Sequence, residues 1–285
     1  MDNKNKKKYT RFLLGNINNQ GKPKNMVNPQ TSNPPNKYGN LNTFVKNHHN
    51  EIKKCNSKSF GNLHKKILIL YACHTNNNLK LKYFNQNFNY LNKIPNSDLV
   101  VINSKEIPNV NILENYYKNQ CFKFFTIPNN KFLDFGKWLY GLENINLSCY
   151  HYITFINDSI IIENPIDFYF TLLRTKNFDL YGFNNSTQTR LHIQTYLFSI
   201  KQEVINKFKH FIKNAGPKIN NNQESVIMNL EVKLTDLYPK YKNFINTRQF
   251  PEHKGKNIFF NHDYLFFQLK KNGLFPFFKI KRIKN

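Results

Sequence analysis

The chain has few cysteines and no long apolar run. Its 285 residues include four widely spaced cysteines, Cys55, Cys73, Cys121 and Cys149. No C-x-x-C pair occurs among them, which argues against a zinc site. The longest apolar run, 67–73, has the length of a strand, whereas a membrane helix needs about 20 apolar residues. The apolar stretch near the start, 12–14, is too short for a signal-peptide core. These features predict buried free thiols in a soluble, cytoplasmic protein.

Acidic residues are scarce as well. Seventeen Asp and Glu face 42 Lys and Arg, which gives a formal net charge of +25. One interpretation is a surface that attracts a polyanion, such as nucleic acid, an acidic membrane or a phosphate-rich substrate. The other is a compositional bias, because Asn, Lys, Ile, Phe and Tyr are plentiful throughout. The lysines form no long repeating pattern, which favours the second interpretation, and a surface for an anionic substrate agrees with both.

Residues 1–63 differ from the rest of the chain. They hold twelve Lys and Arg against two acidic residues, so this segment carries +10 of the net charge. It is rich in Asn and Pro and has little apolar periodicity, so it cannot bury enough apolar surface to offset its chain entropy. We expect a largely disordered basic tail with a short helix around 42–52, followed by a folded domain over 64–285.

From residue 64 onward, apolar runs of strand length alternate with segments of helical periodicity. Within 66–72, the residues from 67 onward form a continuous apolar run, which is typical of a strand buried on both faces of a parallel sheet. Further strands are expected at 98–103, 122–127, 152–156, 179–183 and 192–200, and helices at 79–91, 132–142, 202–215, 224–234 and 264–271. This alternation predicts an α/β sandwich with a mostly parallel central sheet flanked by helices. Ligands of such sheets bind at the carboxyl ends of the strands.

The first candidate site follows the strand 152–156, which ends abruptly at Asn157, Asp158 and Ser159. A carboxylate at a strand end can hold a divalent cation that bridges a diphosphate. Asp158 can also simply cap the turn that follows, as is common after strands. The tripeptide alone leaves both interpretations open.

Two further candidates lie on either side of it in the sequence. Asp134 opens a predicted helix, where it either caps the helix or accepts hydrogen bonds from a ribose or sugar hydroxyl. His192, Gln194 and Tyr196 share one face of the expected strand 192–200, and three polar or amphipathic groups on one face suit a wet cleft. A lone histidine is more often structural, but this face of three is harder to dismiss.

The remaining candidates lie in the last third of the chain. Glu224 is at the first turn of a predicted helix, where the helix dipole alone favours it, but it could also act as the general base for a sugar hydroxyl. His262 is a candidate metal or phosphate ligand, and Lys279 could pair with a diphosphate. A packed aromatic C-terminal segment explains these last two residues equally well.

Taken in order, these segments resemble the rhamnan-synthesis F-type glycosyltransferases of polysaccharide and lipopolysaccharide assembly. The resemblance covers about 64–281 and consists of an ordered set of short matches rather than one decisive motif. The matching segments are 67–71, 99–104, 133–138, 152–159, 192–198, 224–225 and 273–279.

The resemblance implies a GT-A-like, nucleotide-sugar-binding fold. It implies transfer of a sugar, such as the deoxyhexose rhamnose, from a nucleoside diphosphate donor to a hydroxyl of a glycan or glycoconjugate, with an inverting course. Carried over by position, Asp158 would hold the diphosphate, through Mg²⁺ or Mn²⁺ where a metal is used, with Asn157 and Ser159 in support. Asp134 would bind the donor, His192 and Gln194 would line the sugar or acceptor cleft, and Glu224 would be the base beside the catalytic Asp158. From their own residue types, Tyr196 is added to the cleft, Lys279 to the donor residues and His262 to the metal ligands.

One departure from the family pattern matters. The usual acidic motif is Asp-x-Asp, and here only Asp158 is acidic, so metal dependence is in doubt and basic residues could substitute. Two alternatives remain: a basic protein that binds nucleic acid or an acidic surface, and a degenerate relative that binds glycans without turnover. For the transferase, we expect no nucleic-acid partner and peripheral contact with acidic membrane surfaces.

Overall fold

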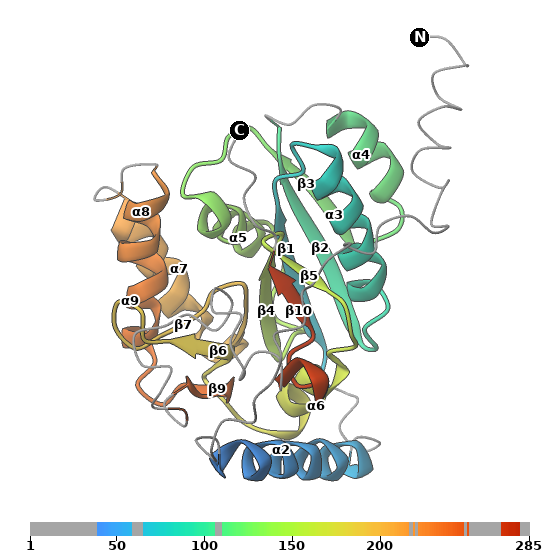
Figure 1. Cartoon of the computed structure of the whole chain (residues 1–285). Coiled ribbons are helices and arrows are strands. Elements are labelled where there is room, and N and C mark those ends of the chain that lie inside the picture. Colours follow the sequence, from blue (N-terminus) through green and yellow to red (C-terminus); the bar gives the residue numbers. More distant parts are fainter. Residues whose placement is uncertain are drawn as a thin grey trace, which may run out of the picture. The chain divides into compact units, whose positions relative to one another are not determined.

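The computed structural model describes residues 39–58, 65–105, 110–216, 219, 222–247, 250 and 269–279 (Figure 1). Its main sheet has the strands β1 Ile67–Cys73, β2 Ser97–Ser104, β3 Lys123–Ile127, β4 Tyr152–Asn157, β6 Leu180–Ser186, β7 His192–Ile193, β8 Leu197–Lys201 and β9 Lys242–Ile245. A separate pair joins β5 Ile160–Ile162 to β10 Phe277–Lys279 in antiparallel register.

The main sheet is mixed but mostly parallel. Its order is β3-β2-β1-β4-β8-β6-β7, and β9 pairs with β6. Strands β3, β2, β1 and β4 are mutually parallel, β8 runs antiparallel to both β4 and β6, and β9 is parallel to β6. All described strands of this sheet except β7 and β8 therefore point the same way.

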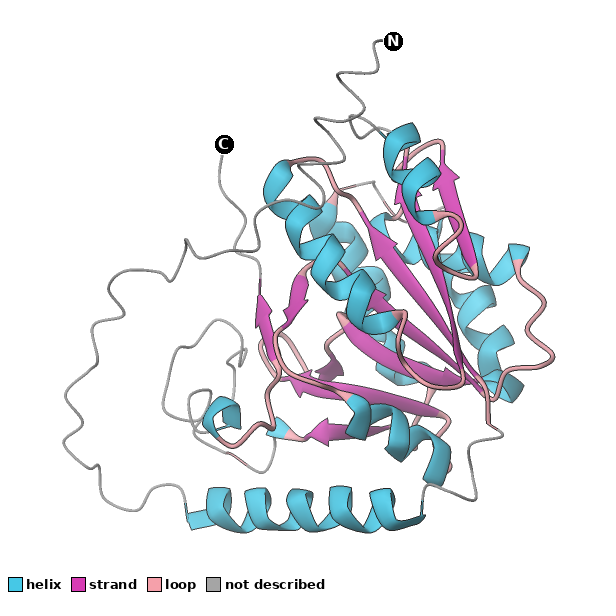
Figure 2. Cartoon of the chain, turned by 90° about the vertical axis from the view of Figure 1, so that its right-hand side faces the viewer, coloured by secondary structure: helices cyan, strands magenta, loops and turns pink. Residues whose placement is uncertain are grey.

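Helices cover both faces of this sheet (Figure 2). They are α2 Gly39–Lys58, α3 Asn78–Leu91, α4 Val110–Tyr117, α5 Leu133–Asn144, α6 Asp167–Thr175, α7 Ile205–Ala215, α8 Gln223–Val226 and α9 Val232–Leu234, with a π-helical turn Ile227–Glu231 between the last two. The predicted α/β sandwich is thus confirmed. The sequence patterns missed α4, α6 and the β5–β10 pair.

Strand β1 shows why the fold has two cores. Its alternate side chains point to opposite faces, and every residue of the strand is fully buried. Ile67, Ile69 and Tyr71 join the core under α2, α3, α4 and α6. Leu68 and Leu70 join the core under α5 and α7. The continuous apolar run predicted a strand enclosed on both faces, and the structure confirms it.

The expected strand 192–200 is wrong in one respect. The structure divides it into β7 and β8, with Gln194 to Tyr196 between them. The backbone N–H of Gln194 donates to the carbonyl of Asn184 on β6 (3.0 Å), and β8 then pairs with β4. Because the strand is interrupted, His192, Gln194 and Tyr196 do not share a single strand face.

Helix α2 corrects the expected extent of the disordered tail. It spans Gly39–Lys58, well beyond the expected short helix. Leu41 and Phe44 are buried, and the Phe44 ring lies 5.3 Å from that of Phe250. The Nε2 of His48 lies 2.8 Å from the carbonyl oxygen of Phe244 on β9. The segment alone has too few apolar residues to fold, but these few pack against a distant part of the chain. Residues 1–38 lie outside the described part.

No helix in the described part of the chain combines the length and the apolar character required for a bilayer span. The described cysteines whose side chains are placed, Cys73, Cys121 and Cys149, are free thiols. Cys73 and Cys121 are buried or half-buried, whereas Cys149 is exposed.

Substituting Phe44→Ala tests the docking of α2. Loss of a buried phenyl ring costs about 3–5 kcal/mol in a typical core, so we expect α2 to detach locally and the unfolding midpoint to fall. Hydrogen exchange of the α2 amides should become faster. Lys46→Ala, at an exposed position of the same helix, is the control and should change neither quantity. Unchanged exchange in Phe44→Ala would contradict this packing.

Candidate active site

Buried polar side chains gather at one edge of the main sheet, which we call the carboxyl edge. Strands β1, β2, β4, β6 and β9 all end there, because they point the same way. Burying polar groups is costly unless they are hydrogen-bonded, so such a concentration is unusual for a purely structural edge. The buried polar residues of this edge are Thr75, Asn103, Ser104, Asn157, Asp158, Asn184, Asn185, Ser186, Gln194, Thr195 and Thr247.

Asp158 lies where the order of the sheet changes direction. From β1 the chain continues to β2 on one side, while β4 lies on the other side, so β1 and β4 border the topological switch point. The backbone N–H of His74, just after β1, donates to Asp158 Oδ2 (2.8 Å). The backbone N–H of Asp158 donates to the carbonyl of Ala72 (3.1 Å). The loops after the two strands are therefore tied together where α/β sheets bind their ligands.

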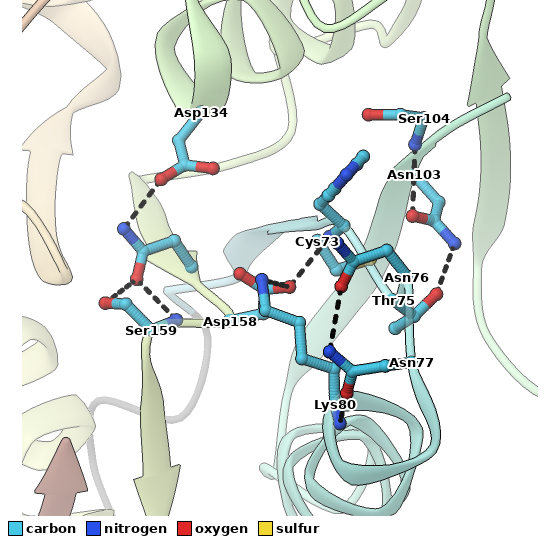
Figure 3. A network of polar contacts seen from close by, with 12 residues as sticks. Cys73, Thr75, Asn76, Asn77, Lys80, Asn103, Ser104, Asp134, Asp158 and Ser159 are labelled. Carbon is cyan, nitrogen blue, oxygen red and sulfur yellow. Dashed lines mark hydrogen bonds and ion pairs between the residues drawn. The ribbon is translucent and has the colours of Figure 1, made fainter. Parts of the chain in front are cut away.

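A lysine from α3 completes the surroundings of Asp158 (Figure 3). Lys80 Nζ lies 3.1 Å from Asp158 Oδ2, and the two side chains are 26% and 11% exposed. Asn77 caps α3 by accepting a hydrogen bond from the backbone N–H of Lys80 (2.9 Å), which fixes the first turn of the helix at the carboxyl edge. Sequence reasoning missed Lys80. Its position in the first helical turn after the buried strand 67–73 was the available signal.

Asn157 links the strand end to α5. Its side-chain amide donates to Asp134 Oδ2 (2.8 Å). Its amide oxygen accepts from the backbone N–H (3.1 Å) and the hydroxyl (2.6 Å) of Ser159. The structure thus brings together Asp134, Asn157, Asp158 and Ser159, four of the residues expected to form the site.

The segment that carries Asp134 is tightly constrained. Phe132 and Leu133 have φ values of 57° and 52°, a left-handed conformation that costs energy in residues other than glycine. A Cβ atom at Gly136 would lie 1.9 Å from the carbonyl oxygen of Lys131, so only glycine fits there. This constraint fixes the direction in which Asp134 leaves the helix.

Asp134 also pairs with a buried lysine. Its Oδ1 lies 3.9 Å from Lys137 Nζ, and Lys137, only 1% exposed, also donates to the side-chain oxygen of Asn130. Burial raises the pKa of the Asp134 carboxyl above its ordinary value; the ammonium of Lys137 opposes this rise, and the charge of Asp158 adds to it. The two carboxylates therefore interact electrostatically, and each has its own ammonium partner.

Cys73 ends β1 beside this group but is unsuited to nucleophilic chemistry. Burial raises the pKa of its thiol well above the ordinary value, and the negative charge of Asp158 raises it further. Its S–H donates to the carbonyl of Ile102 (3.6 Å). Because the thiolate is the reactive form, Cys73 serves as a packing residue.

A second polar group centres on Glu231, the last residue of the π-helical turn. Glu231 Oε2 accepts from the hydroxyl of Thr195 (2.9 Å), and Oε1 accepts from the amide of Gln194 (3.5 Å). His192 Nδ1 lies 2.7 Å from the carbonyl oxygen of Arg190, so this nitrogen carries a proton, and His192 Nε2 faces both the Gln194 amide (3.1 Å) and Glu231 (3.8 Å). The carboxylate is thus held on one side and remains 20% exposed.

The sheet register places this second group next to the first. Ile156 pairs with Leu197, and the backbone N–H of Asn157 donates to the carbonyl of Tyr196 (3.3 Å). Thr195, which holds Glu231, therefore lies in the segment alongside Asp158. Sequence reasoning missed Glu231. The signal was weak, because a π-helical turn changes which residues of a helix face inward.

Tyr196 was expected to line the site but has a structural role. Its ring is buried and 5.5 Å from that of Phe277, and its hydroxyl donates to the side-chain oxygen of Asn184. Burial also raises the pKa of its phenol well above the ordinary value. The turn between β7 and β8 points this side chain into the core, whereas the side chains of His192 and Gln194 contact each other and Glu231.

The three remaining expected residues, Glu224, Lys279 and His262, are not among the described members of these polar groups. Glu224 is exposed in the first turn of α8, and its helix is capped by Asn222, which accepts from the backbone N–H of Ser225 (2.8 Å). Lys279 aligns with Ile160 in the β10–β5 pair, two residues beyond Asp158, but its side chain lies outside the described residues. His262 also lies outside them.

The residues of this edge offer a poor donor set for a divalent cation. Among the described residues, no group of three His, Cys, Asp or Glu is arranged to hold a metal ion. Oδ2 of Asp158 already accepts from an ammonium and from a backbone N–H. Mg²⁺ and Mn²⁺ favour several oxygen ligands, and here the nearest second carboxylate, Asp134, pairs with its own lysine.

Comparisons with known proteins give limited structural similarity. No family model and no curated protein matches the chain. The apo form of the glycosyltransferase GlyE from Streptococcus pneumoniae TIGR4 is similar in structure, with a TM-score of 0.46, 10% identity, and coverage of 78% of this chain and 56% of that chain. The 4-diphosphocytidyl-2C-methyl-D-erythritol synthase from Anaerococcus prevotii DSM 20548 is also similar in structure, with a TM-score of 0.43 and 8% identity. The similarity covers 64% of this chain and 87% of that chain. For the inositol-1-phosphate CTP transferase from T. maritima, the TM-score is 0.42 at 10% identity, with coverage of 64% and 86%. Similarity at this level does not identify an activity.

Substituting Asn157→Leu tests the link between β4 and α5. It removes the hydrogen bonds to Asp134 and Ser159 at a buried position, so we expect the free energy of unfolding to fall by about 1–3 kcal/mol. The pKa of Asp134 should rise further, because the lost bond favours its ionised form. Urea unfolding and an NMR titration of the Asp134 carboxyl measure the two effects. Asn146→Leu, at an exposed position with one local hydrogen bond, should change neither.

Proposed function

We propose that this chain is a nucleotide-sugar-dependent glycosyltransferase with a GT-A-like fold. It transfers a sugar, such as the deoxyhexose rhamnose, from a nucleoside diphosphate donor to a hydroxyl of a glycan or glycoconjugate. The observation that carries the proposal is the linked group Asp134–Asn157–Asp158 at the switch point between β1 and β4. Ligands of open α/β sheets bind outside the strand ends at such a point.

In this proposal the donor lies along the carboxyl edge. Asp134, whose side chain is 30% exposed, accepts hydrogen bonds from ribose or sugar hydroxyls. Asn157 and Ser159 keep Asp134 oriented. Asp158 positions the diphosphate, and Lys279 is a further candidate for phosphate contact.

The transfer requires a base near the acceptor. The C1–O bond to the diphosphate breaks, and its electron pair leaves with the phosphate oxygen. The acceptor hydroxyl forms the new bond to C1 and loses its proton, which in an inverting reaction passes directly to a carboxylate. Glu231 is the best-placed base among the described residues, because Thr195 and Gln194 hold it beside the strand end while part of it stays exposed. His192 supports it, and Glu224 remains the alternative base expected from the sequence.

The acceptor and the cellular location belong to the same proposal. A cytoplasmic enzyme of glycan assembly meets acceptors near membranes, and the net charge of +25 would draw it to acidic lipid surfaces.

The proposed function is tested first at Asp158. Wild-type protein should release nucleoside diphosphate from at least one nucleotide sugar in a donor screen, and Asp158→Ala should lower that rate by about 100-fold or more, as expected for loss of one group that organises charge in the transition state. Asp98→Ala is the matched control. Asp98 pairs with Lys66 at 2.7 Å, but at the opposite edge of the sheet. Full activity in Asp158→Ala, or equal losses in both variants, would exclude this role.

The identity of the base is tested with a matched pair of glutamates. Glu231→Gln should lower kcat for transfer by about 10²–10⁴-fold, the usual contribution of a general base, and should leave donor binding nearly unchanged. Glu224→Gln should keep kcat within about twofold, a change of less than about 0.5 kcal/mol in the activation barrier, because Glu224 is exposed in α8. Single-turnover transfer to a glycan acceptor separates the chemical step from binding. If kcat falls in Glu224→Gln and stays near the wild-type value in Glu231→Gln, Glu224 is the base.

A further inference from the structure

The charges around Asp158 suggest how the leaving group is stabilised. At the switch point, the carboxylates of Asp134 and Asp158 are balanced by two ammonium groups, Lys137 and Lys80, whereas Glu231 belongs to the neighbouring polar group. A divalent cation is attracted by carboxylates that lack such partners. With one lysine for each carboxylate, the group has no formal net charge, so it offers a divalent cation little attraction.

The two lysines differ in their access to a ligand. Lys137 is 1% exposed and is held inside the structure between Asp134 and Asn130. Lys80 is 26% exposed and reaches the switch point from the first turn of α3 (Figure 3). An ammonium has three N–H donors, and Lys80 directs one of them at Asp158 Oδ2. In the described part of the chain, its other donors are therefore available to phosphate oxygens.

We propose that the ammonium of Lys80, held in place by Asp158, binds the donor diphosphate and takes the place of a divalent cation. The inference rests on the proposed function and adds to it the group that binds the leaving diphosphate. Asp158 is then a positioning residue, because it acts through Lys80 rather than through a metal ion.

The step is balanced without a further reactant. As the C1–O bond breaks, negative charge grows on the β-phosphate, and the N–H groups of Lys80 hydrogen-bond to its oxygens. The proton from the acceptor hydroxyl passes to Glu231. Charge-assisted hydrogen bonds of this kind are roughly twice as strong as neutral ones, and they gain strength as the charge develops.

The wild-type protein allows a test that does not depend on any variant. Transfer or donor hydrolysis is measured after exhaustive treatment with EDTA and again after addition of Mn²⁺ or Mg²⁺. We expect the rates to agree within about twofold, a change of less than about 0.5 kcal/mol in the activation barrier. Loss of activity in EDTA with recovery in Mn²⁺ would overturn the inference while leaving the proposed glycosyltransferase intact. Absence of activity with every nucleotide sugar, with and without metal, would instead remove the proposed function itself.

Variants of Lys80 test the same inference from the side of the protein. Lys80→Met should lower kcat/KM by about 100-fold, the effect of removing one preorganised donor to developing charge, and should weaken binding of the free nucleoside diphosphate. Lys80→Arg should recover most of the kcat/KM and most of the affinity for the nucleoside diphosphate, because a guanidinium also binds phosphate. Lys82→Met, exposed on the same helix, is the control.

Addition of Mn²⁺ to Lys80→Met provides the final comparison. Without its ammonium partner Asp158 can accept a cation, so partial recovery by Mn²⁺ is expected if ammonium and metal serve the same purpose. If Lys80→Met keeps wild-type diphosphate affinity and rate, Lys80 does not bind the leaving group. Circular dichroism and the unfolding midpoint establish that each variant is folded, and if Lys80→Met is not folded, the EDTA experiment on wild-type protein decides.

Discussion

The complete burial of β1 is the constraint on which the rest of this structure depends. Its side chains alternate between two apolar cores, so neither face of the sheet near β1 can accept a polar group without loss of stability. Most buried polar side chains of the sheet lie where its strands end, and the mid-strand pair Thr154 and Ser199 satisfies its hydroxyls by a mutual hydrogen bond (2.8 Å). The same constraint brings residues far apart in the sequence to one edge, where backbone N–H groups and lysines can satisfy them.

Much of this arrangement could be predicted from the sequence. The apolar run 67–73 and the abrupt change from Ile156 to Asn157 locate a buried strand and a polar strand end, because burial on both faces leaves such a mark in the residues themselves. The parallel arrangement of β1 and β4 follows from the alternation of strands and helices. The meeting of Asp134 with Asn157 was expected only through a resemblance to a family, and the structure supplies the hydrogen bond that joins them.

The positions of Lys80, helix α2 and Tyr196 could not be predicted, because they depend on contacts between distant parts of the chain. Lys80 is one of 42 basic residues, and its place in the first helical turn after a buried strand does not by itself name a partner; the pairing of β1 with β4 brings Asp158 within 3.1 Å of it. Helix α2 has few apolar residues, and it contacts residues far along the chain, among them Phe244 and Phe250, about 200 positions away. Tyr196 was placed on the wrong side because an uninterrupted strand was assumed where a turn separates β7 from β8.

The π-helical turn Ile227–Glu231 has a consequence for how this region can change over time. In a regular α-helix Glu224 and Glu231, seven residues apart, would lie nearly on the same side, since two turns take about 7.2 residues. The i→i+5 bonding of a π turn accommodates one residue more and rotates the helical residues after the turn relative to those before it. Loss of a single residue within this turn would restore regular α-helical bonding and leave the residues on both sides of it facing much as they do now, because the turn takes up one extra residue. The turn is therefore a place where this segment can absorb a change in length by one residue.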